Sequence, residues 1–215
     1  MPAAIVFAAA PLTPTERLRS RLSQLDEPFV VAADNGATTA LAFGLRPDVV
    51  IGDLDSMEPS TLAQLQEAGV PIEEYPRDKD ATDGELAINR ALQAHPSELF
   101  LLGFLGGPRL DQELANVLLL TRVDIPAVLL DERNECILLR PGDVHTWRPE
   151  TEEVISLIPL SSEVTGVHTN GLRWPLDRER LRFGETRGVS NESISDEVRV
   201  ETESGLLLVT RHFPR

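Results

Sequence analysis

The stretch FVVAADNGATTALAFGLRPDVVIG, residues 29–52, decides the fold. Its two ends, FVVAA and VVIG, are short, continuous apolar runs of the kind that form strands buried on both faces of a sheet. The segment ATTALAF between them suits a short helix, and Gly44 is well placed to end that helix. A strand, a helix and a second strand in this order predict a parallel sheet covered by helices.

The same alternation extends on both sides of this stretch, up to about residue 134. The further apolar runs expected to be strands are 3–10, 71–75, 98–103 and 126–131. Two of the helices between them have a Ser/Thr-x-x-Glu capping box, which starts at Thr13 in one helix and at Thr82 in the other. We therefore expect an α/β, Rossmann-like domain with a mostly parallel sheet over residues 1–134.

After Asn134 the pattern changes to short apolar runs separated by turns rich in Pro, Gly and Asp, and no helix is expected. The segment VRVETESGLLLV, residues 198–209, is typical of a β-hairpin whose turn is Ser204-Gly205. Residues 135–215 therefore predict a second domain, an antiparallel β-sandwich.

Charge and composition narrow the possible partners. The chain has 20 Lys plus Arg against 35 Asp plus Glu, a net charge of −15. Sequence-blind binding to nucleic acid or to an anionic membrane needs a basic face, so both are excluded. No apolar run approaches the roughly 18 residues of a membrane-spanning helix, and the single cysteine, Cys136, excludes an intrachain disulfide. A cytoplasmic location is expected.

Acidic residues follow successive strands of the first domain. They are Asp34, Asp53, Asp55, Asp80, Asp83 and Asp111. Asp34, Asp55 and Asp83, each taken alone, are more often helix caps or first-turn residues, but the carboxyl ends of parallel strands meet at one edge of a sheet, where ligands bind. Crowded carboxylates favour a divalent cation, and Mg²⁺ prefers oxygen ligands and phosphates. Arg77, Lys79 and Arg109 in the same loops suit a polyphosphate, so the joint pattern predicts a metal–phosphate site.

The sequence lacks the motifs of several other common binding and catalytic sites. There is no G-x-x-x-x-G-K-[ST] phosphate loop, no G-x-G-x-x-G dinucleotide fingerprint and no G-x-S-x-G esterase motif. The four histidines lack the spacing of zinc ligands.

Four segments together resemble the thiamine pyrophosphokinase family. They are VVAADNGATTALAFGLRPDVVIGDLDSM (30–57), YPRDKDATDGELAI (75–88), GFLGGPRLDQELAN (103–116) and NGLRWPLDRERLRFGETRGVSNE (170–192). They match, in order, the family's G-D-x-D-S, K-D-x-T-D-x-E and G-G-R-x-D-H/Q segments and its G-L-x-[WY] and G-x-S-N segments. Asn35 stands where the family usually has glycine, and Pro108 is an additional residue before Arg109.

The resemblance implies the reaction and the partners. ATP and Mg²⁺ are expected on the edge of the α/β sheet, and thiamine in a cleft completed by the β domain, across the interface of a homodimer. The thiamine hydroxyl attacks the β-phosphorus of ATP and AMP leaves. The implied roles are catalysis for Asp53, Asp55, Asp83 and Asp111; Mg²⁺ binding for Asp53, Asp55, Asp80 and Asp83; ATP or phosphate binding for Asp34, Arg77, Lys79, Asp80, Thr82, Arg109, Gln112 and Asn116; and thiamine binding for Trp174, Ser190 and Asn191.

Three alternatives remain at this point. A pyrophosphokinase of the same fold acting on another heterocyclic alcohol, such as a pterin, leaves the GLRW and GVSN segments unexplained. A catalytically inactive regulator that binds thiamine or a nucleotide predicts a missing acid, and none is missing. A phosphatase or glycosyltransferase that uses GDLDS as a metal motif gives no role to the KDATD and RLD segments. Either Asp55 or Asp111 is the candidate for accepting the hydroxyl proton.

Overall fold

The computed structural model describes residues 2–54, 57–76, 78 and 80–214. The chain divides into two compact units, Met1–Glu132 and Arg133–Arg215, which we call unit 1 and unit 2. Among the residues described, no helix is both long enough and apolar enough to pass through a lipid bilayer.

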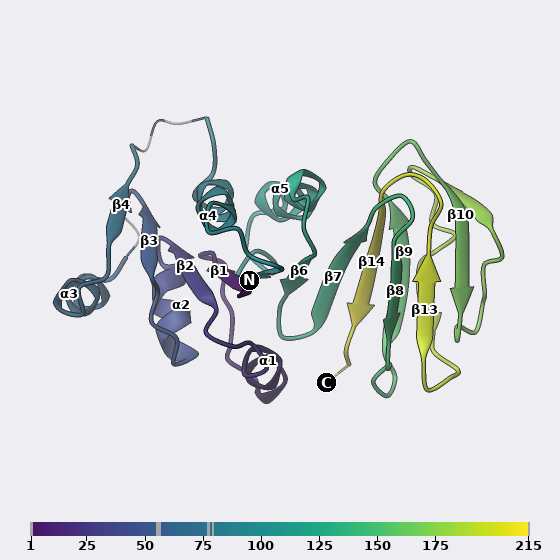
Figure 1. Cartoon of the computed structure of the whole chain (residues 1–215), viewed down its shortest axis with the longest axis horizontal. Coiled ribbons are helices and arrows are strands. Elements are labelled where there is room, and N and C mark those ends of the chain that lie inside the picture. Colours follow the sequence, from purple (N-terminus) through teal and green to yellow (C-terminus); the bar gives the residue numbers. More distant parts are fainter. Residues whose placement is uncertain (1, 55–56, 77, 79, 215) are drawn as a thin grey trace. The chain divides into compact units, whose positions relative to one another are not determined.

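Unit 1 is built on a parallel sheet (Figure 1). Its strands are β1 (Ala4–Phe7), β2 (Phe29–Ala33), β3 (Val49–Gly52), β4 (Ile72–Glu74), β5 (Leu99–Leu102) and β6 (Ala127–Leu130). They lie in the order β6-β5-β1-β2-β3-β4, and every neighbouring pair is parallel. Except for β2, whose first residue is half-buried, and the weakly apolar β4 at the edge, these strands are buried along their whole length, as their continuous apolar runs predict.

The helices of unit 1 cover both faces of this sheet. They are α1 (Glu16–Leu22), α2 (Gly36–Ala42), α3 (Pro59–Glu67), α4 (Asp83–Leu92) and α5 (Leu110–Leu119), followed by the short 3-10 helix η1 (Leu120–Arg122). The chain moves outward from β1 to β4 and then returns to β5 on the other side of β1. Since parallel crossovers are right-handed, this reversal puts α4 and α5 on the face opposite α1 and α2 (Figure 1).

The helix caps agree with the sequence in one case and differ in the other. Thr82 caps α4, and its hydroxyl accepts a hydrogen bond from the N–H of Glu85 at 3.1 Å. The expected cap at Thr13 is wrong. Helix α1 begins at Glu16 and is capped by Thr15, whose hydroxyl accepts a hydrogen bond from the N–H of Leu18 at 3.4 Å; the N–H of Thr13, which a capping box would pair with Glu16, donates to the carboxylate of Glu132 at 2.6 Å.

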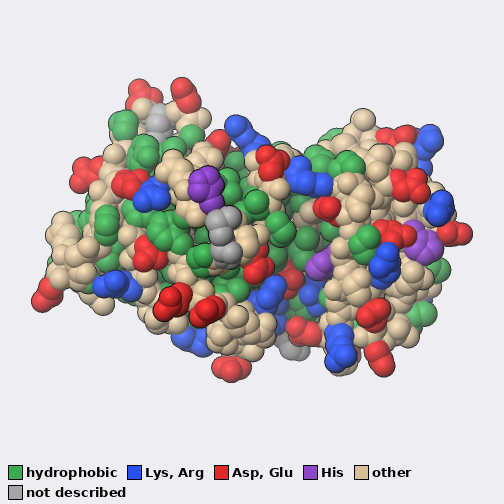
Figure 2. All heavy atoms as spheres, in the orientation of Figure 1, with side chains coloured by type: hydrophobic (Ala, Val, Ile, Leu, Met, Phe, Trp, Pro, Cys, Tyr) green, Lys and Arg blue, Asp and Glu red, His purple; other side chains and the backbone are tan. Residues whose placement is uncertain are grey.

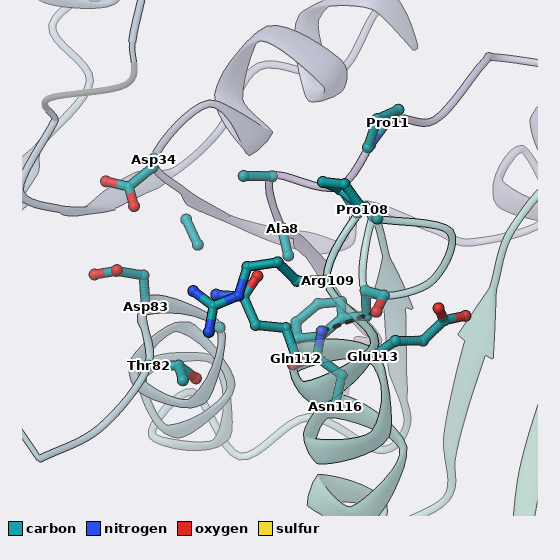
Figure 3. A pocket seen from close by; sticks show the side chains of 17 residues that line it. Ala8, Pro11, Asp34, Thr82, Asp83, Pro108, Arg109, Gln112, Glu113 and Asn116 are labelled. Atoms are coloured by element: carbon teal, nitrogen blue, oxygen red, sulfur yellow. Dashed lines mark hydrogen bonds between the residues drawn. The ribbon is translucent and has the colours of Figure 1, made fainter.

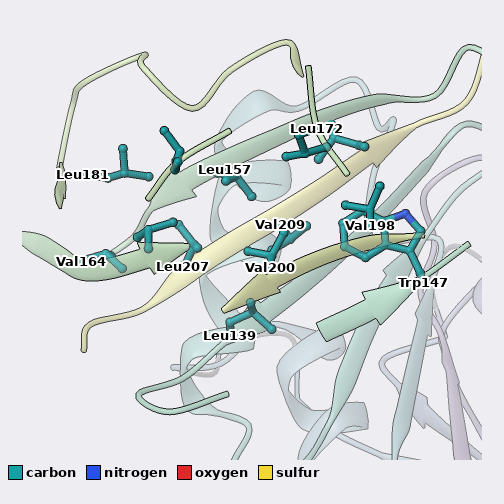
Figure 4. Packing of buried hydrophobic residues seen from close by; sticks show 13 residues of the cluster. Leu139, Trp147, Leu157, Val164, Leu172, Leu181, Val198, Val200, Leu207 and Val209 are labelled. Atoms are coloured by element: carbon teal, nitrogen blue, oxygen red, sulfur yellow. The ribbon is translucent and has the colours of Figure 1, made fainter. Parts of the chain in front are cut away.

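Unit 2 is an antiparallel sandwich whose described residues contain no helix. Its strands are β7 (Asn134–Leu139), β8 (Val144–Trp147), β9 (Val154–Pro159), β10 (Glu163–Asn170), β11 (Glu179–Arg182), β12 (Asn191–Glu192), β13 (Val198–Glu201) and β14 (Leu207–His212). One sheet has the order β12-β9-β14-β7 and the other β11-β10-β13-β8. Buried side chains from both sheets form one core, which includes Leu157, Val200 and Val209 (Figure 4). The predicted β-sandwich is confirmed.

The predicted hairpin over residues 198–209 is wrong. Strand β13 pairs with β10 and β8, whereas β14 pairs with β7 and β9, so the two strands belong to different sheets. Val198 and Val200 face Leu207 and Val209 through the core. An alternating sequence pattern shows only which side chains of a strand are buried. Two strands of a hairpin and two strands that face each other across a sandwich bury the same alternating positions, so the pattern does not distinguish these two arrangements.

A buried ion pair connects the strands of unit 2. Glu153 has a fully buried side chain and accepts hydrogen bonds from Nε and Nη2 of Arg211 at 2.8 and 2.9 Å. The indole N–H of Trp147 donates to the same carboxylate at 3.0 Å, and Glu135 lies 3.4 Å from Arg211. Burial lowers the pKa of Arg211, but the hydrogen bonds and negative charges of these carboxylates outweigh it and raise the pKa overall. Arg211 therefore stays charged inside the unit.

Surface charges of unit 2 are largely paired. Five arginines of segment 173–187 each lie within 3.7 Å of a glutamate: Arg173 with Glu192, Arg178 with Glu203, Arg180 with Glu163, Arg182 with Glu185, and Arg187 with Glu179. On the face shown in Figure 2, acidic and basic side chains are interspersed. The arginines of this segment thus do not create a basic surface.

Candidate active site

A pocket of about 310 Å³ lies at the carboxyl ends of the strands of unit 1. The loop after β1 and the loop after β5 form two of its walls, so it occupies the point where the strand order reverses. In open α/β sheets this is where ligands bind. Six residues predicted for the site line it, and Figure 3 shows them: Asp34, Thr82, Asp83, Arg109, Gln112 and Asn116.

Glycine allows these two loops to approach each other. Gly103 has φ +72°, and a Cβ atom at this position would lie 2.3 Å from the carbonyl oxygen of Ala8. A contact under 3 Å with backbone cannot be relieved by a side-chain rotation, so the wall of the pocket requires glycine at this position.

Asp34 is positioned by the backbone around it. It adopts the left-handed conformation, with φ +46°, and its Oδ1 accepts a hydrogen bond from the N–H of Leu54 at 3.3 Å. A Cβ atom on Gly52 would lie 1.7 Å from the same oxygen. The Asp34 carboxylate therefore lies directly over Gly52, and any other residue at position 52 would displace it.

Asp34 and Asp83 line this end of the pocket, and both Asp83 and Asp53, which does not line it, interact electrostatically with Asp34. Burial, which is the largest cause, and the negative charges of Asp83 and Asp53 together raise the pKa of Asp34 to about 6, against the opposing effect of the hydrogen bond from Leu54. The nearness of the Asp83 side chain is thus among the causes of the raised pKa. The structure thus brings together acids that follow β2 and β3 with the acid that begins α4, and their repulsion would be relieved by a cation.

The carboxylate oxygens of this cluster suit a hard divalent cation that also binds ligands from outside the protein. Within the described part of the chain, no three His, Cys, Asp or Glu side chains are grouped closely enough to form a metal site by themselves. Mg²⁺ is commonly bound by one or two carboxylates together with phosphate oxygens and water, rather than by a cage of protein atoms. The cluster of Asp34, Asp53 and Asp83 is compatible with binding of this kind.

Arg109 and Asp111 form a pair at the start of α5. Nε of Arg109 donates to Asp111 at 3.2 Å, and Nη2 donates to the other carboxylate oxygen. The hydrogen bonds from Arg109 lower the pKa of Asp111. Both side chains are largely exposed; Arg109 lines the pocket, whereas Asp111 does not. Asp111 is therefore positioned to orient Arg109.

The other predicted residues of unit 1 are placed as follows. Asp80 is exposed and does not line the pocket. Asp55, Arg77 and Lys79 lie outside the described residues. Of the two departures from the family pattern, Asn35 has an ordinary helical φ of −63° and accepts a hydrogen bond from the Thr38 hydroxyl at 2.8 Å, and Pro108 lines the pocket.

Of the four charged residues that line the pocket in the described structure, one was not predicted from the sequence. Glu113 lines the pocket, and its Oε1 accepts a hydrogen bond from the N–H of Gly106 at 3.3 Å. A glutamate in the first turn of a helix is favoured there in any protein, so its position gives no signal of a site.

The three residues predicted to bind thiamine are close to one another in unit 2. Trp174 is 54% exposed, and the guanidinium of Arg173 lies 5.7 Å from the centroid of its ring. Asn191 is buried: its Oδ1 accepts from the N–H of Trp174 at 3.1 Å, and its Nδ2 donates to the Trp174 carbonyl at 2.7 Å. Ser190 is exposed in the left-handed conformation. Asn191 thus fixes the backbone of the exposed indole.

Comparisons with known proteins agree with this geometry. An open α/β sheet with a polar, carboxylate-rich pocket at its switch point defines a phosphate- or nucleotide-binding class of protein. Residues 22–129 match the family described as thiamin pyrophosphokinase, catalytic domain, and residues 143–207 match thiamin pyrophosphokinase, vitamin B1 binding domain. The chain belongs to the thiamin pyrophosphokinase family.

Three similar proteins illustrate this membership. A thiamine pyrophosphokinase of Bacillus subtilis is 29% identical over 84% of this chain and 86% of its own length. Thiamine pyrophosphokinase 1 of Oryza sativa is 30% identical over 75% of this chain and 65% of its own length. The crystal structure of a thiamin pyrophosphokinase from Geobacillus thermodenitrificans has a TM-score of 0.84 at 29% identity and covers 100% of this chain and 98% of that one.

Proposed function

We propose that this chain transfers the pyrophosphoryl group of ATP to thiamine. The hydroxyl oxygen of thiamine attacks the β-phosphorus, the bond from that phosphorus to the oxygen bridging the α- and β-phosphates breaks, and the products are thiamine diphosphate, AMP and a proton. The observation that carries the proposal is the switch-point pocket with its carboxylate cluster and Arg109, in a chain that matches both domains of the family.

The pocket of unit 1 is the proposed ATP site. Asp53 and Asp83 are proposed as Mg²⁺ ligands, with Asp55 and Asp80 as the further candidates from the sequence. Bound Mg²⁺ would neutralise phosphate charge. The guanidinium of Arg109 points along the pocket toward the side of Asp34 and Asp83 in Figure 3, where it would bind phosphate oxygens. Thr82, at the start of α4, would place phosphate at a helix N-terminus.

The proton-accepting role suits Asp55 better than Asp111. A general base should have a pKa near the working pH, and the hydrogen bonds from Arg109 move the pKa of Asp111 in the opposite direction. We assign Asp111 the role of orienting Arg109. Gln112 and Asn116, one turn apart on α5, line the wall expected to contact the rest of the nucleotide.

A dimer and a cytoplasmic location are also part of the proposal. Leu110, Leu114 and Leu118 follow one another at four-residue spacing on α5 and are 69, 56 and 52% exposed, which supports a contact with a second copy. The buried, free Cys136 is consistent with a reducing compartment.

The direct test measures AMP release from ATP in the presence of Mg²⁺, with and without thiamine. We expect AMP and thiamine diphosphate in equal amounts, and neither product when thiamine or the cation is omitted. A pterin alcohol in place of thiamine is the matched acceptor control. AMP formation without thiamine, faster turnover of the pterin, or ligand binding without any AMP would contradict the proposal.

The exposed indole of Trp174 gives a prediction for the thiamine site. Thiamine is a cation with aromatic rings, and stacking on an indole contributes about 0.5–2 kcal/mol. Trp174→Ala is therefore expected to raise the KM for thiamine about tenfold and to leave the KM for ATP unchanged, while Trp174→Phe keeps most of the affinity. Phe183→Ala, which removes another exposed aromatic side chain of unit 2, is the control. Equal changes in both KM values would show that the indole supports the fold rather than the ligand.

A further inference from the structure

The loop after β5, residues 103–109, is held by two side chains of α5. Nδ2 of Asn116 donates to the carbonyl oxygen of Phe104 at 2.8 Å, and Oε1 of Glu113 accepts from the N–H of Gly106 at 3.3 Å. Residues 113 and 116 are three apart and therefore lie on the same face of the helix. One side chain thus binds a carbonyl group of the loop and the other binds an N–H group.

This loop needs external support because of its composition. Gly103, Gly106 and Gly107 make up three of its seven residues, and the first two have positive φ, at +72° and +75°. Glycine-rich segments have the largest conformational entropy to lose on ordering. At its N-terminal end the loop is fixed by the buried Phe104, whose ring would lie 3.0 Å from a Cβ atom on Gly84. Further along the loop, the N–H of Gly106 binds Glu113, and a Cβ atom at this glycine would meet no other atom within 4 Å.

We propose that Glu113 is a positioning residue that holds this loop in its ligand-ready conformation through the N–H of Gly106. The inference rests on the proposed function, because the loop forms a wall of the pocket assigned to ATP. A loop that adopts its binding conformation only part of the time lowers the apparent affinity by that fraction. Glu113 therefore affects the affinity for the nucleotide, and it affects neither the affinity for the acceptor nor the rate of the chemical step.

Two other roles for Glu113 make different predictions. In Figure 3 its carboxylate points away from Asp34 and Asp83, so it does not belong to the carboxylate cluster. A first-turn acid also stabilises a helix through the helix dipole, a role that any carboxylate at this position would fill and a neutral amide would not. The proposed role needs only a hydrogen-bond acceptor, and glutamine retains one.

The experiment compares Glu113→Ala with Glu113→Gln in the full chain. Hydrogen bonds to charged groups contribute enough that losing this one should raise the KM and the Kd for ATP by about three- to tenfold, with kcat and the KM for thiamine within about a factor of two. Glu113→Gln should restore the ATP affinity. Hydrogen exchange of the peptide containing Gly106, measured without ligand, should speed up in Glu113→Ala and stay slow in Glu113→Gln. Glu16→Ala, which removes an exposed first-turn acid of α1, should change none of these values.

The outcomes separate the inference from the proposed function. A lower KM for ATP in Glu113→Ala would overturn the inference, since it would show that the carboxylate competes with a ligand for the N–H of Gly106. Equal loss of affinity in both variants would also overturn it and assign Glu113 to the helix dipole. If the unmodified chain releases no AMP, the proposed function fails, and the exchange rate of Gly106 still decides whether Glu113 holds the loop.

Discussion

Asp34→Asn is expected to slow pyrophosphoryl transfer by about 100- to 1000-fold, the cost of losing one electrostatic contact in a catalytic site. The same substitution is expected to stabilise the chain, without ligands or Mg²⁺, by about 1 kcal/mol at pH 8. Asparagine keeps the acceptor for the Leu54 N–H and is, with aspartate, among the residues best suited to the left-handed conformation at this position. The substitution therefore removes a charge and little else.

The pH dependence follows from the raised pKa of Asp34. Its value of about 6 in the folded chain lies above the model value of 3.8, so the folded state binds more protons between these two pH values. Stability is then lost as the pH rises from about 4 to about 6, and the loss is complete above pH 6. Asp34→Asn should match the unmodified chain at pH 4 and exceed it at pH 8. The full shift would amount to about 3 kcal/mol, which we reduce to about 1 kcal/mol because the group is only half-buried.

Urea unfolding at pH 4 and pH 8 measures this difference. Asp196→Asn changes the net charge equally at an exposed position and is the control. With Mg²⁺ and ATP added, the unmodified chain should become more stable than Asp34→Asn, because ligands stabilise the form that binds them. A gain that is the same at both pH values, or one that persists with Mg²⁺ and ATP, would show that the cost of the charge on Asp34, from burial and from the neighbouring acids, is not its cause.

Glu153→Gln is expected to destabilise unit 2 by about 3–5 kcal/mol, since it removes the fully buried carboxylate that binds two nitrogens of the buried Arg211 guanidinium. The glutamine amide group would also point N–H donors at the N–H donors of Arg211. Urea unfolding followed by tryptophan fluorescence reports this directly, because Trp147 donates to the same carboxylate.

Glu201→Gln is the matched control for this prediction. Glu201 also pairs with an arginine, Arg199, at 2.6 Å, but its side chain is 34% exposed. Exposed pairs of this kind contribute up to about 1 kcal/mol. If Glu153→Gln and Glu201→Gln lower the free energy of unfolding by the same small amount, burial does not make the Glu153 pair more important for stability than a surface pair.

The sequence predicts the parallel sheet because a strand buried on both faces cannot tolerate a polar residue, and this leaves continuous apolar runs such as FVVAA and FLL. It does not identify sheet neighbours in the sandwich. Val198 and Val200 alternate with polar residues in the same way whether β14 lies beside them or across the core from them. The cap of α1 differs from the prediction for a similar reason: Thr13 and Thr15 are both good caps, and the sequence does not show that the N–H of Thr13 binds Glu132, far along the chain, in place of Glu16.

The location of the pocket is also predictable, because strand ends of a parallel sheet converge whatever their side chains are. What each side chain binds is not predictable. Asp111 follows β5 as Asp53 follows β3, yet it pairs with Arg109, two residues away. Asn191 lies in a segment predicted to contact a ligand, but both ends of its amide are used by the backbone of Trp174. Such choices depend on rotamers and on distances of a few ångströms that a motif does not encode.

The position of β14 has a consequence for how unit 2 is made. This strand lies between β7 and β9, and both precede it along the chain. During synthesis on the ribosome, β7 and β9 therefore expose unpaired edges until β14 has been translated, whereas every strand of unit 1 is already complete. Unit 1 can fold while translation continues, whereas the sheet of unit 2 that contains β7 and β9 can be completed only after β14 has been made.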